Sequence, residues 1–178
     1  MSLRIALLGL LQAYGSASGY DLAKRFERSV AHVWQAGHSQ IYPELAKMAA
    51  DALVTVEAEG VRGRKTYSIT PEGHAELRAW LLGHDPTGPA RSEMALQAFL
   101  VPLLGREEAL VVLRRMREHG ERKLAELEAL RAAKHASSVP TGTGRVRFGD
   151  LALDLGIRQT RTALEWADDA IAEIERQT

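Results

Sequence analysis

The chain has 178 residues, of which 46% are hydrophobic, so it is long and apolar enough for one large or two small folded domains. The absence of cysteine excludes disulfide bonds, thiolate zinc sites and a cysteine nucleophile. A formal net charge of zero argues against a protein that coats nucleic acid nonspecifically, although a local basic patch is enough for a sequence-specific regulator.

The N-terminal segment is apolar but does not have the pattern of a targeting or membrane segment. Nowhere does the chain reach the run of about 18 apolar residues that a transmembrane helix needs. Residues 1–12 include Arg4 and show neither a basic start nor a small-residue cleavage site. We therefore expect a folded first helix in a cytoplasmic protein.

Apolar residues at helical spacing predict three helices in the first part of the chain. The first covers residues 3–14, and the second runs from Gly19 to about Val30 with Ser16 or Ser18 as its cap. Ser39 is the expected N-cap of the third helix, and Pro43 is expected near its first turn. The buried stripe of this third helix is predicted to be Ile41, Leu45, Met48, Ala49 and Ala52.

A β-hairpin is predicted after the third helix. Apolar and polar residues alternate over 54–59, a turn follows at 60–63, and 66–69 read as a second strand. The hairpin tip carries Arg62, Arg64 and Lys65. Thr70 is then expected to cap a helix with Pro71 at its first position, whose buried residues are predicted to be Leu77, Trp80 and Leu81.

Residues 83–91 are expected to form a linker between domains at 1–82 and 92–178, because they combine proline, glycine and polar residues. The second domain is predicted to be helical. It comprises an apolar stripe kinked at Pro102, a long helix over 107–136 that Gly120 weakens, a flexible loop at 137–147 and a last helix over 150–176. The kinked stripe consists of Leu96, Phe99, Leu100, Leu103 and Leu104.

The last helix carries apolar residues seven apart, a spacing typical of a helix that packs along a partner helix. Because two long helices in so small a domain cannot bury both stripes well alone, we expect a homodimer. The predicted interface residues are Leu3, Leu7, Ile157, Leu164, Trp166 and Ile171.

Three helices followed by a basic hairpin have the order of a winged helix-turn-helix, so the predicted fold is mainly α with a small β-hairpin wing. The third helix of such a fold enters the major groove of DNA and presents its first side chains to base edges. Gln40 can pair bidentately with adenine, while Ser39 and Tyr42 are suited to phosphates. The predicted DNA contacts are Lys24, Arg25, His38, Ser39, Gln40, Tyr42, Lys47, Arg62, Arg64 and Lys65.

At these residues the sequence resembles the PadR family of bacterial transcription regulators over residues 1–82. The segments that carry the resemblance, in the family's order and spacing, are Leu8-Gly9-Leu10-Leu11, Ser18-Gly19-Tyr20-Asp21-Leu22, Ser39-Gln40-Ile41-Tyr42-Pro43-Glu44-Leu45, Gly63-Arg64-Lys65, Tyr67-Ser68-Ile69-Thr70-Pro71-Glu72-Gly73 and Trp80. The later helices look like the family's C-terminal dimerisation domain. The resemblance implies a homodimeric regulator, usually a repressor, that binds a pseudo-palindromic operator and in some members is released by a small aromatic effector.

The sequence departs from the family pattern just before the wing. Where the family usually has an acidic run ending in glycine before leucine, this chain has Ala49-Ala50-Asp51-Ala52-Leu53. We therefore expect a tighter or more helical turn between the third helix and the hairpin.

Several residues allow a second interpretation. The basic tip of the hairpin could be a solvated turn, and Tyr42 could pack against Tyr20 instead of touching DNA. Trp34 and Trp166 could each stack on an aromatic effector, or Trp166 could anchor the dimer. The histidines lack the i, i+4 spacing and carboxylate partner of a metal site, and Gly142-Thr143-Gly144 lacks the context of a phosphate loop, so we expect no metal and no cofactor.

Two other classes of function compete with specific DNA binding. A winged helix can serve as a protein-binding module, and the net charge of zero is compatible with that role. An enzyme is not supported, because the sequence has no nucleophile elbow, no paired catalytic carboxylates and no cofactor fingerprint.

Overall fold

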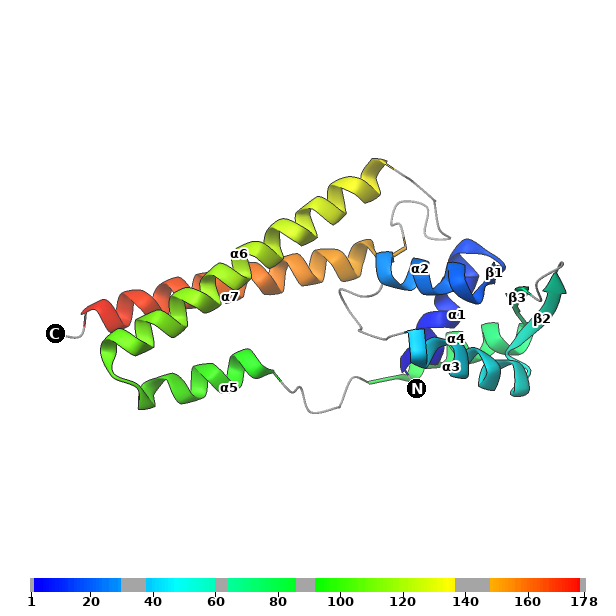
Figure 1. Cartoon of the computed structure of the whole chain (residues 1–178), viewed down its shortest axis with the longest axis horizontal. Coiled ribbons are helices and arrows are strands. Elements are labelled where there is room, and N and C mark those ends of the chain that lie inside the picture. Colours follow the sequence, from blue (N-terminus) through cyan, green and yellow to red (C-terminus); the bar gives the residue numbers. More distant parts are fainter. Residues whose placement is uncertain (1, 30–37, 60–63, 86–91, 137–147, 177–178) are drawn as a thin grey trace. The chain divides into compact units, whose positions relative to one another are not determined.

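The computed structural model describes residues 2–29, 38–59, 64–85, 92–136 and 148–176 (Figure 1). The chain divides into two compact units, residues 1–86 and 87–178. This division falls within the predicted linker at 83–91, although Gly83 belongs to a helix and residues 86–91 lie outside the described part.

The first unit is built around helix α1 (Ser2–Tyr14), which lies against α2 (Gly19–Ser29), α3 (His38–Ala50) and α4 (Pro71–Gly83). Ser18 caps α2, because its Oγ accepts a hydrogen bond from the Asp21 backbone N–H at 3.2 Å and donates one to the Asp21 carboxylate at 2.6 Å. The predicted apolar stripes form the core, whose fully buried side chains are Leu7, Leu8, Leu10, Leu11, Leu22, Phe26, Ile41, Leu45 and Met48.

The sheet of this unit has the order β1–β3–β2 and is antiparallel. Strands β2 (Val54–Glu59) and β3 (Arg64–Ile69) form the predicted hairpin, with Val54 opposite Ile69 and Glu59 opposite Arg64. The short strand β1 (Ala17–Ser18) pairs Ala17 with Tyr67 and was not predicted, because two residues are too few to show an alternating pattern. It ties the turn before α2 to the hairpin.

Helix α3 ends in a Schellman motif, in which one residue adopts the left-handed conformation. The N–H of Leu53 donates to the Met48 carbonyl at 2.9 Å, and the N–H of Ala52 donates to the Ala49 carbonyl at 3.2 Å. Ala52 has φ 57° and is exposed, so the predictions of a buried Ala52 and of a tighter or more helical turn were wrong. The left-handed position of a Schellman motif is usually occupied by glycine, and in this chain alanine occupies it.

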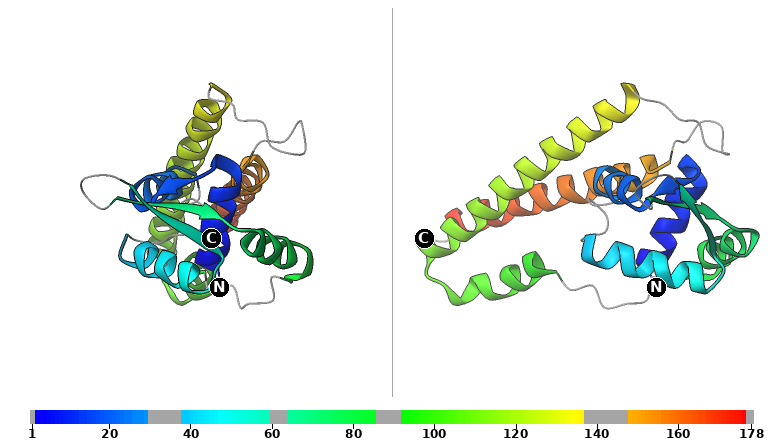
Figure 2. Two further views of the ribbon diagram at one scale, coloured as in Figure 1. Left: turned by 90° about the vertical axis from the view of Figure 1, so that its right-hand side faces the viewer. Right: turned by 45° about the vertical axis from the view of Figure 1, so that its right-hand side comes forward.

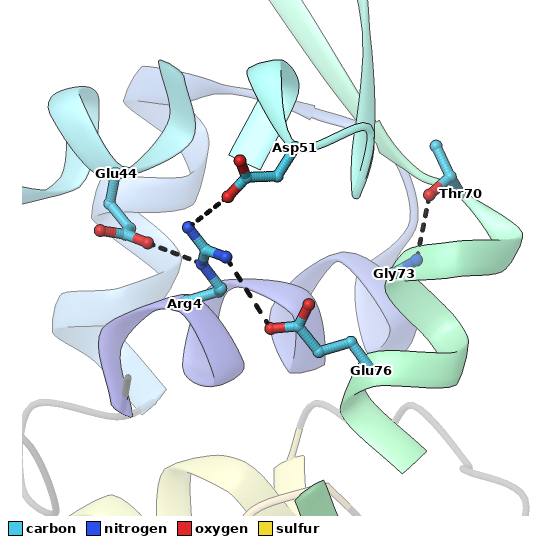
Figure 3. Close-up of polar contacts among 6 residues, drawn as sticks. All are labelled: Arg4, Glu44, Asp51, Thr70, Gly73 and Glu76. Carbon is cyan, nitrogen blue, oxygen red and sulfur yellow. Dashed lines mark hydrogen bonds and ion pairs between the residues drawn. The ribbon is translucent and has the colours of Figure 1, made fainter. Parts of the chain in front are cut away.

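Thr70 caps α4 as predicted (Figure 3). It also connects α4 to the end of α3. Its Oγ1 accepts from the Gly73 N–H at 3.0 Å and donates to the Ala52 carbonyl at 2.8 Å, while its own N–H donates to the Leu53 carbonyl at 3.1 Å. A Cβ on Gly73 would overlap the Leu53 carbonyl oxygen, so only glycine lets the two segments approach this closely. Leu81, predicted to be buried, is exposed on α4.

The second unit begins with a short helix that ends at the predicted kink. Helix α5 (Glu93–Leu100) gives way to a 3₁₀ turn, η1 (Val101–Leu103), so Pro102 ends the helix instead of bending a longer one. The apolar side chains of this segment, from Met94 to Leu104, are largely exposed; Phe99 retains 79% of its accessible surface.

Helices α6 (Arg106–Ala136) and α7 (Asp150–Arg176) pack side by side as an antiparallel pair (Figures 1 and 2). Leu164 of α7 sits against Gly120, where a Cβ would lie 2.8 Å from its Cδ2 atom. Gly120 therefore provides the space for a close helix–helix contact, a role that the sequence prediction missed. The predicted loop at 137–147 lies outside the described residues.

Buried residues form a core cluster on each side of this glycine contact. One contains Val101, Ala109, Leu113 and Met116, with Ile171 and Ile174 packed against it. The other contains Leu127, Leu153 and Ile157. The seven-residue repeat of α7 thus faces α6 of the same chain.

We predict that Ala52→Gly raises the free energy of unfolding by about 0.5–1 kcal/mol, because glycine removes the cost of a Cβ in the left-handed region. Urea denaturation followed by circular dichroism measures this change. The matched control Ala46→Gly, an exposed position within α3, should instead lower the unfolding free energy by about 1 kcal/mol. Equal destabilisation by both substitutions would contradict the strain at Ala52.

Candidate DNA interface

Helix α3 has one face in the core and the opposite face open. Ile41, Leu45 and Met48 are buried against the rest of the unit. The residues that alternate with them at helical spacing are exposed, namely Ser39, Gln40, Tyr42, Pro43, Ala46, Lys47 and Ala50. The structure therefore brings the predicted contacts Ser39, Gln40, Tyr42 and Lys47 onto the outer side of one helix.

The start of α3 differs from the prediction. His38 is already helical, so Ser39 lies inside the helix and is not its N-cap, and Pro43 falls beyond the first turn. An interior proline removes the hydrogen bond that its N–H would have given to the carbonyl four residues earlier. Only the backbone of His38 is described, so its predicted DNA contact stays a prediction.

Tyr42 connects the outer face of α3 to the start of α2. A Cβ on Gly19 would lie 2.7 Å from Cε1 of Tyr42, so the tyrosine ring packs on this glycine. The ring nevertheless remains exposed at its outer side. Tyr42 also interacts electrostatically with Tyr67 on β3. The pKa of Tyr67 is raised, mainly by burial and to a smaller extent by this interaction with Tyr42. Tyr42 therefore combines packing against Gly19 with an exposed edge that a ligand can reach.

The basic residues of α2 differ in their surroundings. Lys24 is exposed, with its Nζ 4.6 Å from the centre of the Tyr20 ring. Arg25 is partly buried; it donates to the Tyr14 carbonyl at 3.4 Å and lies over the Tyr14 ring at 5.4 Å. These contacts give Arg25 a structural role at the end of α1 that the sequence prediction missed.

The hairpin places Lys65 on an exposed position of β3, next to the predicted basic tip. Arg62 lies outside the described residues, and only the backbone of Arg64 is described. The predicted contacts of the wing therefore remain predictions.

An ionic cluster beside α3 was not predicted from the sequence (Figure 3). Arg4 on α1 donates through Nε to Glu44 at 2.9 Å and pairs through Nη2 with Asp51 at 2.7 Å. Glu76 on α4 lies 4.0 Å from Nη1 of the same guanidinium. The signal in the sequence was a single charge within an apolar helix, but its partners lie 40 or more residues away and spacing alone does not identify them.

In the second unit, the predicted interface residues are used largely within the chain. Ile157 is buried against α6, Leu164 packs on Gly120, and Ile171 packs on the cluster around Leu113. In the first unit Leu7 is fully buried in the core. The assignments of Leu7 and Ile157 to a dimer surface were therefore wrong, because their side chains have no free surface, while Leu3 and Trp166 keep partial exposure.

Among the described residues, no group of His, Cys, Asp and Glu side chains is arranged to hold a metal ion. Within that same part of the chain, no helix has the length and apolar character needed to cross a membrane.

Comparison with known proteins identifies the family. The family model for PadR-like transcriptional regulators matches residues 7–79, and the model for the virulence activator alpha C-terminal region matches residues 90–175. The negative transcriptional regulator PadR of Bacillus subtilis is 31% identical, over 98% of this chain and 98% of its own. The chain belongs to the PadR-like family of transcriptional regulators.

Solved structures agree with this family in fold. Bacillus subtilis PadR in complex with operator DNA is similar with a TM-score of 0.82 and 29% identity, covering 98% of this chain and 99% of that chain. The same regulator in complex with p-coumaric acid has a TM-score of 0.84 and 30% identity, covering 98% of this chain and 96% of that chain. The PadR-like winged helix-turn-helix predicted from the sequence is thereby confirmed, and so is its place among regulators instead of enzymes.

We predict that Arg25→Ala lowers the free energy of unfolding by about 1–2 kcal/mol, because it removes a hydrogen bond and a cation–π contact. The neighbouring Lys24→Ala should change stability little. It should weaken DNA binding and lower the slope of the salt dependence by about one counterion, because it removes one positive charge near the phosphates. Thermal unfolding and a salt series of DNA titrations measure the two effects. Loss of DNA affinity in Arg25→Ala without loss of stability would contradict the structural role.

Proposed function

We propose that the chain is a sequence-specific DNA-binding repressor that acts as a homodimer on a pseudo-palindromic operator. The observation that carries this proposal is the exposed outer face of α3, where Ser39, Gln40, Tyr42 and Lys47 lie opposite the buried residues. A helix with this division fits the major groove with its open face toward the bases. The operator complex of the similar Bacillus subtilis PadR supports the assignment.

The residues of the interface divide by chemistry into those that specify and those that position. Gln40 has the amide that pairs with the N6 and N7 atoms of adenine. Ser39 and Tyr42 have hydroxyl groups suited to phosphates. Lys24, Lys47 and the wing residues Arg62, Arg64 and Lys65 would contribute positive charge along the DNA backbone, whereas Arg25 is held at the end of α1. His38 stands at the start of the same helix.

The homodimer is supported by the apolar surface of the second unit. Met94, Leu96, Phe99, Leu100, Leu103 and Leu104 are exposed along α5 and η1 and just beyond them. A run of exposed apolar residues of this kind is typical of a surface that a partner covers. We assign the dimer contact of the second unit to this surface and to Trp166, because the residues facing α6 are already used within the chain. In the first unit, Leu3 remains a proposed contact of its own.

A small aromatic effector is the second ligand that we propose. The p-coumaric acid complex of the similar Bacillus subtilis regulator supports this class of molecule. Trp166 on α7 keeps 39% of its accessible surface and offers an indole face on which an aromatic ring can stack. Such an effector would act by lowering the affinity of the protein for its operator. We propose that both binding events take place in the cytoplasm.

We predict tight binding of the purified protein to a duplex from its own upstream region, measured by fluorescence anisotropy across a salt series with random duplex as competitor. Gln40→Ala should weaken binding to the operator by about 1–3 kcal/mol and leave binding to random duplex unchanged, because it removes a contact to a base. Lys65→Ala should weaken binding to both duplexes and lower the salt slope by about one, because it removes a charge near the backbone.

Parent protein that binds operator and random duplex equally in this titration would refute sequence-specific regulation at that site. The protein would then be tested against a genome-wide DNA selection. Failure of that selection would favour a winged-helix module that binds another protein.

We predict that Phe99→Asp converts the dimer to a folded monomer, because a charge at the centre of an apolar contact cannot be solvated there. Analytical ultracentrifugation measures the change, with circular dichroism to show that the helices remain. Leu82→Asp on α4 is the matched control, since Leu82 is 73% exposed and is not among the residues assigned to the dimer contact, so its substitution should leave the dimer intact. A dimeric Phe99→Asp protein would refute the α5 surface as the contact.

A further inference from the structure

The sequence of α3 and the residue that follows it raise an electrostatic problem for a DNA-binding helix. Between residues 39 and 51 the acidic side chains Glu44 and Asp51 outnumber the basic Lys47. Helical spacing places Gln40, Glu44, Lys47 and Asp51 one after another along the same side of the helix. Duplex DNA carries one negative charge per about 1.7 Å of its axis, so free carboxylates at these positions would repel it.

The structure turns both carboxylates toward α1. Nε of Arg4 donates to Oε1 of Glu44 at 2.9 Å, and Nη2 of Arg4 lies 2.7 Å from Oδ2 of Asp51. The Glu44 side chain keeps 20% of its exposure and the Asp51 side chain keeps 50%. The pKa of Arg4 is raised, chiefly by its hydrogen bond with Glu44 and also by the one with Asp51, whereas burial acts to lower it.

We propose that Arg4 is a positioning residue for DNA binding, which holds Glu44 and Asp51 against α1 and offsets part of their negative charge so that α3 can approach the phosphates. This inference rests on the proposed function, because it takes the outer face of α3 as the DNA-binding surface. Arg4 reaches Glu44 and Asp51 from α1 and needs no contact with DNA.

The geometry explains why an arginine occupies this position. Its planar guanidinium presents separate N–H groups to separate acceptors, so one side chain reaches the carboxylates of Glu44 and Asp51 through different nitrogens. Partly exposed ion pairs generally contribute little to folding stability. Reducing the negative charge of a helix that must meet a polyanion is a role for this cluster that does not depend on its small contribution to stability.

The test is a titration of the full-length protein with its operator duplex and with random duplex at about 0.1 M salt, where charges act over roughly 10 Å. Arg4→Met should weaken binding to both duplexes by a similar factor, about fivefold, because the unmasked carboxylates repel any phosphate backbone. Adding Glu44→Gln and Asp51→Asn to Arg4→Met should restore at least the parental affinity, because both unpaired carboxylates are then gone. Arg4→Lys should keep most of it, because the positive charge remains beside Glu44.

Two controls separate this role from a loss of structure. Arg78→Met removes a positive charge from an exposed position of α4 and should change affinity less than Arg4→Met does. A variant that keeps Arg4 but carries Glu44→Gln and Asp51→Asn should bind both duplexes more tightly than the parent, and it informs on the proposal even where Arg4→Met fails to fold. Circular dichroism and thermal unfolding confirm that each variant is folded.

Two results would overturn the proposal. In the first, Arg4→Met weakens binding to the operator but not to random duplex, and adding Glu44→Gln and Asp51→Asn does not restore it. This result would indicate that α3 is displaced and that Arg4 has no electrostatic role. The other is an unchanged affinity in the variant that keeps Arg4 and lacks both carboxylates. A parent protein without preference for its operator would refute the proposed function instead. The effect of Arg4→Met on binding to random duplex would still test the electrostatic role of Arg4.

Discussion

The carbonyl group of Leu53 is the point on which the arrangement of the first unit depends. Leu53 follows the left-handed residue that ends α3, and its carbonyl oxygen accepts from the N–H of Thr70 and lies against Gly73. One peptide group thus joins the end of α3, the start of β2, the end of β3 and the first turn of α4. The orientation of α3 follows from this junction, since the segments on both sides of it are fixed in the same few hydrogen bonds.

Much of the first unit could be predicted because its signals are local. Apolar spacing gave the helices, alternation gave the β2–β3 hairpin, and the Thr70-Pro71 pair marked the start of α4. The outer face of α3 followed directly from the buried one. The start of α3 was placed wrongly because Ser39 has the chemistry of a cap, and chemistry alone does not show that the helix begins before it.

What could not be predicted involves partners far apart in the chain. Arg4 meets Glu44 across 40 residues, and β1 consists of two residues that only β3 defines. The repeat of α7 correctly indicated a partner helix, but periodicity does not say whether that helix belongs to the same chain. The structure shows that it is α6, and it leaves the apolar side chains of α5 largely exposed.

The contact between Gly120 and Leu164 has a consequence for how the α6–α7 pair tolerates change. The residues that pack at one end, around Leu113, share no member with those around Leu127 at the other end. Packing energy couples residues that touch and decays quickly beyond them. The pair is therefore modular along its length, so the two ends can accumulate substitutions separately as long as the glycine between them keeps the helices in register.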